Sequence, residues 1–217
     1  PVTHGFRKGF IEQAENSGLM IWQYIPLEEL EHIDHSKSGR NYRININTDF
    51  KLTKYLSASM FYHYSGAEAL ERQHQSSKTY YTRNLINSFT EIGGGEKLIY
   101  NLPPGGILDL TTGALTNQNL RAQININKHW SNSHRLEGIA GYEFRNQHSI
   151  ENKVRRYGYN NDLGTFSPVS YLIPYPQYYS IFGAMATIPF ADFERELVDR
   201  FRSFYSNFTS TLQDKYI

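Results

Sequence analysis

The chain has 217 residues, a formal net charge of +1 and no cysteine, and aromatic residues make up 15% of it. The near-neutral charge gives no reason to expect a nucleic-acid partner, and the lack of cysteine excludes a disulfide framework and a thiolate metal site. No run of about 18 apolar residues is present, which excludes a transmembrane helix. A membrane-spanning strand is not excluded, because a barrel wall needs an apolar side chain only at every second position.

The first 40 residues show no clear strand pattern and are expected to form the end of a loop. Within them, the segment GLMIWQYIPLEEL (18–30) is expected to make a short helix capped by Ser17. His32 and His35 have a metal-like spacing, but no third ligand is patterned around them. No metal site and no cofactor are therefore predicted.

From residue 43 the chain alternates between apolar and polar side chains. In RININTD (43–49), Ile44 and Ile46 alternate with Asn45 and Asn47. A period of two predicts a strand with one apolar and one polar face. The pattern resumes over 56–65 after a short turn, so the two segments are predicted to form a β-hairpin.

The same plan returns later in the chain. Residues 119–127 alternate, residues 131–133 form a turn, and residues 135–145 alternate again. A further strand descends over 204–212 towards a turn near residue 214. Two segments of about 50 residues, 66–118 and 149–198, separate these units and are predicted to be long loops.

The connections differ on the two edges of the predicted sheet, with short turns on one edge and long loops on the other. Tyr55, Trp130 and Tyr216 each lie beside a short turn, as an interfacial aromatic girdle requires. This arrangement is typical of an outer-membrane barrel, in which strands of about 9–11 residues, tilted by about 45°, cross the hydrocarbon. The isoleucines would then face lipid and the asparagines a wet lumen.

The sequence resembles a known family along most of its length from about residue 40. The most specific segment is NLRAQININKHWSNSHRLEGIAGYEFR (119–145), in which R-x-Q-x-N-x-N-K-x-W is followed by H-x-L-x-x-x-A-G-x-E. It is similar to the barrel of the SusC/RagA-type TonB-linked outer-membrane proteins of Bacteroidetes. Four further segments share the resemblance: TYYTRNLINSFTE (79–91), LPPGGILDL (102–110), RRYGYNND (155–162) and DRFRSFYSNFTSTLQDKY (199–216).

The resemblance implies an all-β fold, an antiparallel up-and-down transmembrane β-barrel segment of about five to six strands from a barrel of about 22. Residues 1–40 would be an extracellular loop region and residues 41–217 a partial barrel, with no recognisable plug, TonB box or N-terminal domain. We therefore expect a part of a longer protein in the cell outer membrane. Such proteins import oligosaccharides or peptides, with a SusD-like surface lipoprotein over the extracellular mouth and TonB acting on the plug.

Two groups of residues are candidate sites. Loop residues with aromatic faces and amide or guanidinium donors suit a sugar or peptide ligand, and the polar row of the central hairpin would face the lumen. The alternative for the loops is a segment folded on itself with structural turns, and for the row it is cross-strand pairing or contact with the plug. The ligand candidates are Tyr80, Tyr81, Arg83, Asn84, Tyr157, Tyr159 and Asp162, and the lumen-facing row is Arg121, Gln123, Asn125, Glu143 and Arg145.

Other functions fit less well. A secreted β-sandwich, acting as a carbohydrate-binding module or adhesin, would use the same alternation with a second sheet over the apolar face. A siderophore receptor is disfavoured by the central motif. An enzyme is not expected, because no catalytic set converges; Glu137 and Glu143 share a face but lie about 20 Å apart along a strand.

Overall fold

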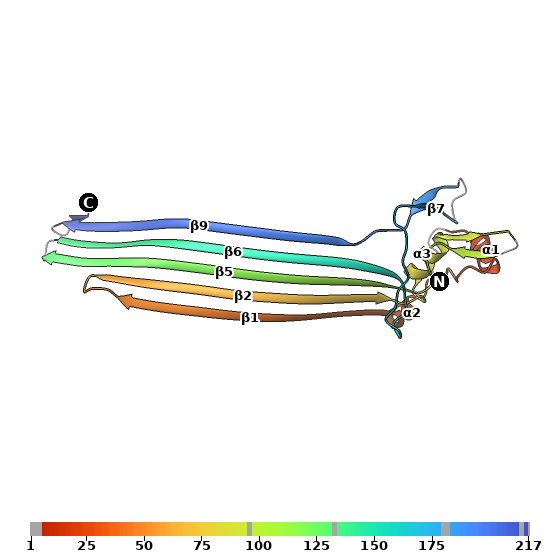
Figure 1. Cartoon of the computed structure of the whole chain (residues 1–217), viewed down its shortest axis with the longest axis horizontal. Helices are drawn as coiled ribbons and strands as arrows, with labels where there is room; N and C mark the ends of the chain where they lie inside the picture. Colours follow the sequence, from red (N-terminus) through yellow and green to blue (C-terminus); the bar gives the residue numbers. More distant parts are fainter. Residues whose placement is uncertain (1–5, 95–96, 132–133, 179–182, 213–214, 217) are drawn as a thin grey trace. The chain divides into compact units, whose positions relative to one another are not determined.

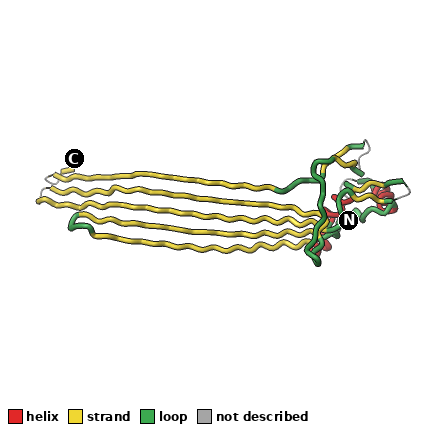
Figure 2. Tube along the Cα trace, viewed as in Figure 1, coloured by secondary structure: helices red, strands yellow, loops and turns green. Residues whose placement is uncertain are grey.

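The structure, a computed structural model, describes residues 6–94, 97–131, 134–178, 183–212 and 215–216, and for residues 131, 215 and 216 the backbone alone. Antiparallel β-structure dominates the described chain, which confirms the predicted all-β class. Figure 1 labels the elements and Figure 2 separates strands from helices and loops. Three helices are α1 (Lys8–Asn16), α2 (Pro26–His32) and α3 (Tyr80–Ser88). The strands are β1 (Ile33–Lys51), β2 (Leu56–Gln75), β3 (Thr90–Ile92), β4 (Leu98–Tyr100), β5 (Gly106–Ser131), β6 (His134–Tyr159), β7 (Pro174–Pro176), β8 (Met185–Thr187), β9 (Phe193–Leu212) and β10 (Lys215–Tyr216).

One large sheet contains the long strands, in the order β1-β2-β5-β6-β9-β10. Strands that follow each other in this sheet are neighbours, as the serial up-down prediction requires, and Figure 1 shows β1, β2, β5, β6 and β9 side by side. Two further ladders, β3-β4 and β7-β8, each pair three residues. The connections between the long strands therefore carry only small sheets of their own.

The long strands exceed their predicted lengths. They contain 19 residues in β1, 20 in β2 and β9, and 26 in β5 and β6. The predicted loops over 66–118 and 149–198 are correspondingly too long, because strands occupy both ends of each segment. Apolar alternation marks only part of each strand. The remainder mixes polar residues with apolar ones such as Leu70, Leu115 and Val198, and gives no such signal.

The first turn has the predicted position. Leu52 N–H donates to the carbonyl of Leu56 at 3.0 Å. Thr53 Oγ1 accepts from the backbone N–H groups of Tyr55 (3.2 Å) and Leu56 (3.1 Å), so one hydroxyl satisfies two turn donors. The predicted turns at 131–133 and near 214 include residues outside the described ones.

The first 40 residues differ most from the prediction. The helix that Ser17 was expected to begin instead ends there. Ser17 is the C-cap of α1, its Oγ donates to the Gln13 carbonyl at 3.0 Å, and Gly18 follows with φ +91°, the left-handed conformation that terminates helices. The next helix, α2, starts at Pro26, a residue preorganised for the first helical position. Strand β1 then begins at Ile33, so the predicted loop region 1–40 contains two helices and the start of a strand.

The chain divides into two compact units. Unit 1 comprises residues 1–38, 70–112 and 152–193, and unit 2 comprises 39–69, 113–151 and 194–217. Unit 1 has two buried apolar clusters. One gathers around Ile86, Leu102 and Tyr157. The other gathers around Trp22 and Ala14.

Candidate functional site

The odd-numbered face of the unit 2 sheet carries a row of hydrogen-bonded polar side chains, called the polar ladder below. Arg121 Nε donates to Tyr205 Oη at 3.1 Å, and Tyr205 Oη donates to Gln123 Oε1 at 2.9 Å. Gln123 Nε2 donates to Asn125 Oδ1 at 2.6 Å, and Asn125 Nδ2 donates to Ser57 Oγ at 3.4 Å. The polar ladder thus joins side chains of β9, β5 and β2.

A glycine in β6 allows Tyr205 to reach β5. A Cβ atom at Gly141 would lie 2.3 Å from the Tyr205 ring, closer than any real contact. With no side chain at this position, the ring crosses β6, and the Arg121 guanidinium carbon lies 5.0 Å from the ring centroid. Gly141 is therefore the position on which the cross-strand hydrogen bonds depend.

The predicted lumen-facing row is divided in the structure. Arg121, Gln123 and Asn125 belong to the polar ladder, and each makes a cross-strand hydrogen bond of the kind that was the alternative to a transport path. Arg145 instead lies 5.2 Å from the Phe201 ring centroid. Glu143 forms no ion pair with any residue that the structure describes.

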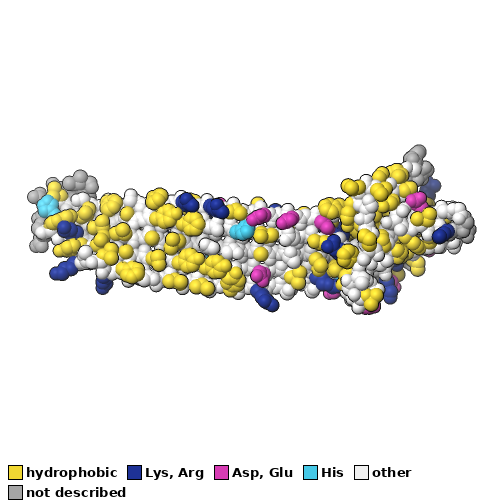
Figure 3. All heavy atoms as spheres, in the orientation of Figure 1, with side chains coloured by type: hydrophobic (Ala, Val, Ile, Leu, Met, Phe, Trp, Pro, Cys, Tyr) yellow, Lys and Arg dark blue, Asp and Glu magenta, His cyan; other side chains and the backbone are white. Residues whose placement is uncertain are grey.

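The even-numbered face of unit 2 has an apolar part in which several large side chains are exposed. Ile44 is 52% exposed, Phe208 54% and Phe204 84%. Figure 3 shows hydrophobic side chains crowded together on one part of this face and charged side chains beyond them. We call the hydrophobic part the apolar band. It follows the even-numbered positions of 42–50 in β1, 56–66 in β2, 120–126 in β5, 136–144 in β6 and 204–212 in β9, where Thr48, Ser206 and Ser210 are the polar members.

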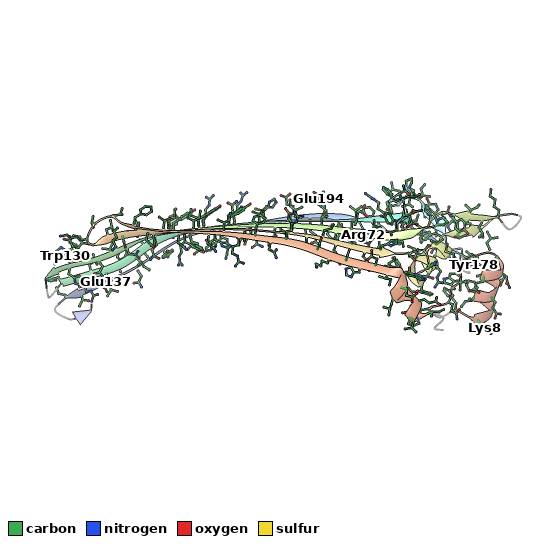
Figure 4. The ribbon with its side chains drawn as sticks, turned by 90° about the horizontal axis from the view of Figure 1, so that it is seen from below. Lys8, Arg72, Trp130, Glu137, Tyr178 and Glu194 are labelled. Atoms are coloured by element: carbon green, nitrogen blue, oxygen red, sulfur yellow. The ribbon has the colours of Figure 1, made fainter. Side chains whose placement is uncertain are left out.

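The apolar band has a defined limit on every long strand. The next even-numbered residues beyond it are polar or charged on all five strands. The side chains alternate to both sides of the sheet, as Figure 4 shows, so these residues lie in the same rows as the apolar ones. The five residues are Arg40, Glu68, Gln118, Asn146 and Arg202.

The turn end of the apolar band carries aromatic and basic side chains together. Lys128 Nζ lies 4.7 Å from the Trp130 ring centroid and 5.4 Å from that of Tyr55. Both rings are exposed. Two of the three predicted girdle aromatics thus share one cation, and the side chain of Tyr216 lies outside the described residues.

The first ligand candidates lie on a helix rather than in a loop. The predicted loop 79–91 contains α3, because Thr79 caps its N-terminus and accepts a hydrogen bond from Thr82 N–H. The side chain of Asn84 accepts from Trp22 Nε1 at 2.9 Å, and Arg83 Nη2 donates to the Gln23 carbonyl at 2.8 Å. Two of the polar groups proposed for a ligand are thus used to hold the helix to the N-terminal segment.

The two tyrosines of this group differ in exposure. Tyr80 is half-buried and packs edge-on against Tyr24, with ring centroids 5.6 Å apart. Tyr81 is 39% exposed, and its hydroxyl accepts from Arg155 Nη1 at 3.3 Å. Among the α3 candidates, Tyr81 is therefore the one whose ring surface is most open to a ligand.

Tyr157 is wrongly predicted as a ligand contact. It is only 1% exposed, packs in the core of unit 1, and donates its hydroxyl hydrogen to the Pro189 carbonyl at 2.7 Å. Burial raises the pKa of Tyr157 to about 12, because the ionised phenolate would lose its hydration.

The remaining residues of this segment have separate roles. Tyr159 packs edge-on against His74 at a centroid distance of 5.4 Å. The Arg72 guanidinium carbon lies 6.0 Å from the centroid of the Tyr159 ring. Asp162 is exposed, and its backbone N–H donates to Asn160 Oδ1 at 2.9 Å. The structure thus has the turn that was the alternative to ligand binding here.

A buried ion pair in unit 1 was not predicted. Asp109 of β5 accepts two hydrogen bonds of 2.6 Å from Arg155 of β6, from Nε and Nη2, and Lys153 Nζ lies 3.4 Å away. Burial alone would raise the pKa of Asp109, but the hydrogen bonds and charges of Arg155 and Lys153 outweigh it and lower that pKa. In the sequence, this ion pair is indicated only by two basic residues, Lys153 and Arg155, at alternate positions of one strand.

The described part of the chain shows neither a metal-binding cluster nor a membrane-spanning helix. Its residues contain no group of histidine and acidic side chains that would hold a metal ion. None of its helices is long and apolar enough to cross a membrane. No family model matches the chain, and no curated protein matches it.

Proposed function

We propose that the chain is a wall segment of a SusC-like, TonB-linked outer-membrane transporter that imports oligosaccharides or peptides. The observation that carries this proposal is the apolar band, which leaves large hydrophobic side chains exposed on β1, β2, β5 and β9 of one sheet. An apolar surface of this extent requires a covering partner. Lipid on the band and water on the polar ladder would solvate both faces.

The limit of the apolar band on the side away from the turns lies nearer to the turns on β5 than on β2. Asn125 donates to Ser57 across these strands, so the two residues are opposite each other. Five residues further along each strand, Leu120 is opposite Tyr62. The band thus ends on β5 four residues nearer to the turns than on β2, where it ends at Gly66 (66 − 62).

The other strand pairs complete the outline of this limit. Between β1 and β2 the limit is level, because the Tyr42 ring lies over Gly66. Between β5 and β6 it is level as well, because Arg155 bonds to Asp109 across these strands and, eleven residues nearer to the turns, Phe144 is opposite Leu120 (155 − 144 and 120 − 109). From β6 to β9 this limit moves towards the turns again. Phe204 packs against Tyr142 at a centroid distance of 5.0 Å, two residues short of Phe144 (144 − 142).

The total shift of this limit along the strands, from β1 to β9, corresponds to the tilt of a membrane strand. Six residues (4 + 2) at about 3.3 Å each make about 20 Å, and four strand spacings of about 4.8 Å make about 19 Å. A planar lipid boundary would therefore cross the strands at about 45°, near the tilt of about 35–45° found in membrane barrels. This agreement supports lipid as the partner of the apolar band.

The edges of the sheet are consistent with a larger wall. β1 is the first strand of the sheet and has one paired side. In lipid, each unpaired backbone group costs several kcal/mol, so only a closed set of strands is stable there. We infer that further strands of the same wall pair with the sheet edges.

Cargo and partners come from the resemblance. The polar ladder supplies amide, hydroxyl and guanidinium groups that suit hydroxyl-rich or peptide cargo. The SusD-like lipoprotein would meet the extracellular segments, and TonB would act through a plug that this chain does not recognisably contain. In this role the wall performs no bond chemistry and uses no cofactor.

A secreted β-sandwich remains the alternative function. A sandwich needs a second sheet with matching apolar rows over the first. The described strands form one large sheet and two ladders of three residue pairs, so none of them supplies such a sheet. This observation favours the transporter.

The test is purification of the protein from its native outer membrane in mild detergent. We expect a band whose gel mobility changes on heating, because a closed barrel resists detergent until it is boiled, and we expect a SusD-like lipoprotein to co-purify. Recovery in the soluble secreted fraction, without a mobility change, would reject the transporter and favour the sandwich.

A further inference from the structure

Two arginines lie at the limit of the apolar band on β9. Arg200 and Arg202 are both exposed and both even-numbered, so they are successive side chains of one face, directly beyond Phe204. The Arg202 guanidinium carbon lies 5.8 Å from the Phe144 ring centroid. Arg200 Nε donates to Asn146 Oδ1 at 3.3 Å. Neighbouring side chains of β6 thus orient both guanidinium groups.

No carboxylate neutralises this pair within the described part of the chain. On the opposite face Arg195 is paired with Glu151, and on the same face Glu196 is paired with His148 at 2.7 Å. No comparable ion pair forms at Arg200 or Arg202. The terminal amino groups of Arg200 therefore have no hydrogen-bond partner among the described residues, while the neighbouring charges are satisfied.

The position of the pair selects the chemistry of its ligand. Guanidinium groups bind phosphate oxygens through two parallel hydrogen bonds, and unpaired basic groups at a membrane surface attract anionic headgroups. Directly next to the pair, Phe204 is 84% exposed, so the same ligand would meet a hydrocarbon surface. A molecule with a phosphate at one end and acyl chains at the other fits both.

We propose that Arg200 and Arg202 bind the phosphate-bearing headgroup of an outer-leaflet lipid, whose acyl chains lie along Phe204 and Phe208. This inference rests on the membrane placement in the proposed function. It adds a specific lipid site to a surface that would otherwise contact lipid without selectivity.

The test compares lipid retained by the protein after purification from its outer membrane and repeated washing in a phosphate-free detergent. The double variant Arg200→Gln/Arg202→Gln is compared with Arg43→Gln/Arg145→Gln, which removes two exposed arginines from the odd-numbered face. Organic phosphorus per protein, with mass spectrometry of the extracted lipid, is the readout. We expect the first variant to retain at least three-fold less phosphorylated lipid and the second to match the wild type.

The outcomes separate this inference from the function on which it rests. Heat-modifiable mobility is recorded for every variant, so a misfolded protein is recognised. Equal lipid retention in both variants would overturn the lipid site while leaving the barrel intact. If inorganic phosphate alone stabilised the protein as much as the lipid does, the lipid site would also be overturned, and the two arginines would be assigned to a free anion instead. A wild-type protein without heat-modifiable mobility would instead reject the proposed function.

Discussion

At the scale of single residues, two glycines of β6 leave room for aromatic rings of β9 in the unit 2 sheet. Tyr205 lies over Gly141 on the polar face, and Phe208 lies over Gly138 on the apolar face. Each ring covers a position without a side chain, which buries part of the ring surface against β6. On each face of the sheet, an aromatic ring of β9 thus covers a glycine of β6.

Replacing Gly141 with alanine tests the dependence of the polar ladder on this crossing. The added Cβ would collide with the Tyr205 ring, so we expect the ring to move, the hydrogen bonds to Arg121 and Gln123 to break, and stability to fall by about 1–3 kcal/mol. The measurement is the temperature at which heat-modifiable mobility is lost. Gly113→Ala is the matched control, since a Cβ there meets no atom closer than 4.0 Å; equal loss in both variants would contradict the prediction.

At the scale of elements, the ion pair between β5 and β6 stabilises unit 1. Asp109 has a lowered pKa in the folded state, so it binds fewer protons than in the unfolded chain at the same pH. Its contribution is therefore complete above its ordinary pKa and is lost as the pH falls through the lowered value. Arg155 keeps its charge throughout, because its pKa is raised further by Asp109.

We expect Asp109→Asn to destabilise unit 1 by about 3 kcal/mol at neutral pH, because the partly buried Arg155 would lose the carboxylate that accepts its two hydrogen bonds. We also expect the variant to lose the acid-dependent part of the wild-type stability. Hydrogen exchange of the β5 and β6 amides, measured from neutral pH to below the ordinary aspartate pKa, tests both. A variant that keeps the wild-type pH dependence would show that another carboxylate is responsible.

The sequence predicts the elements to different degrees for identifiable reasons. Alternation places Ile44 and Asn45 on opposite faces and identifies the hairpins, since a strand with one apolar and one polar face requires it. It fails beyond Arg40 and Glu68, where polar side chains occupy most positions of both faces. The helix α3 was missed although Thr79 is a good N-cap, because a tyrosine-rich segment between strands was interpreted as a ligand-binding loop. The burial of Tyr157 depends on contacts with Pro189 that no local pattern contains.

At the scale of the whole molecule, the two faces of the sheet have different solvents in our proposal, and neighbouring positions test this directly. Ile46 and Asn47 are adjacent and both exposed, but they lie on opposite faces. Arginine on a lipid-facing strand costs about 2–4 kcal/mol near the bilayer midplane, whereas a lumenal arginine costs little. We expect Ile46→Arg to reduce the amount of inserted, heat-modifiable protein several-fold and Asn47→Arg to leave it unchanged. Equal effects of the two substitutions would mean that water covers both faces.

The length of the strands has a consequence for how they find their partners. Beyond the apolar band, apolar residues such as Leu70 and Val198 are mixed with polar and charged ones, so a slip by one residue there would cost less than within the band. Within the band the same slip would turn Ile124 towards water and Asn125 towards hydrocarbon, so only one alignment is tolerated. In our proposal, the alignment of neighbouring strands is therefore fixed within the band, where lipid and water cover opposite faces.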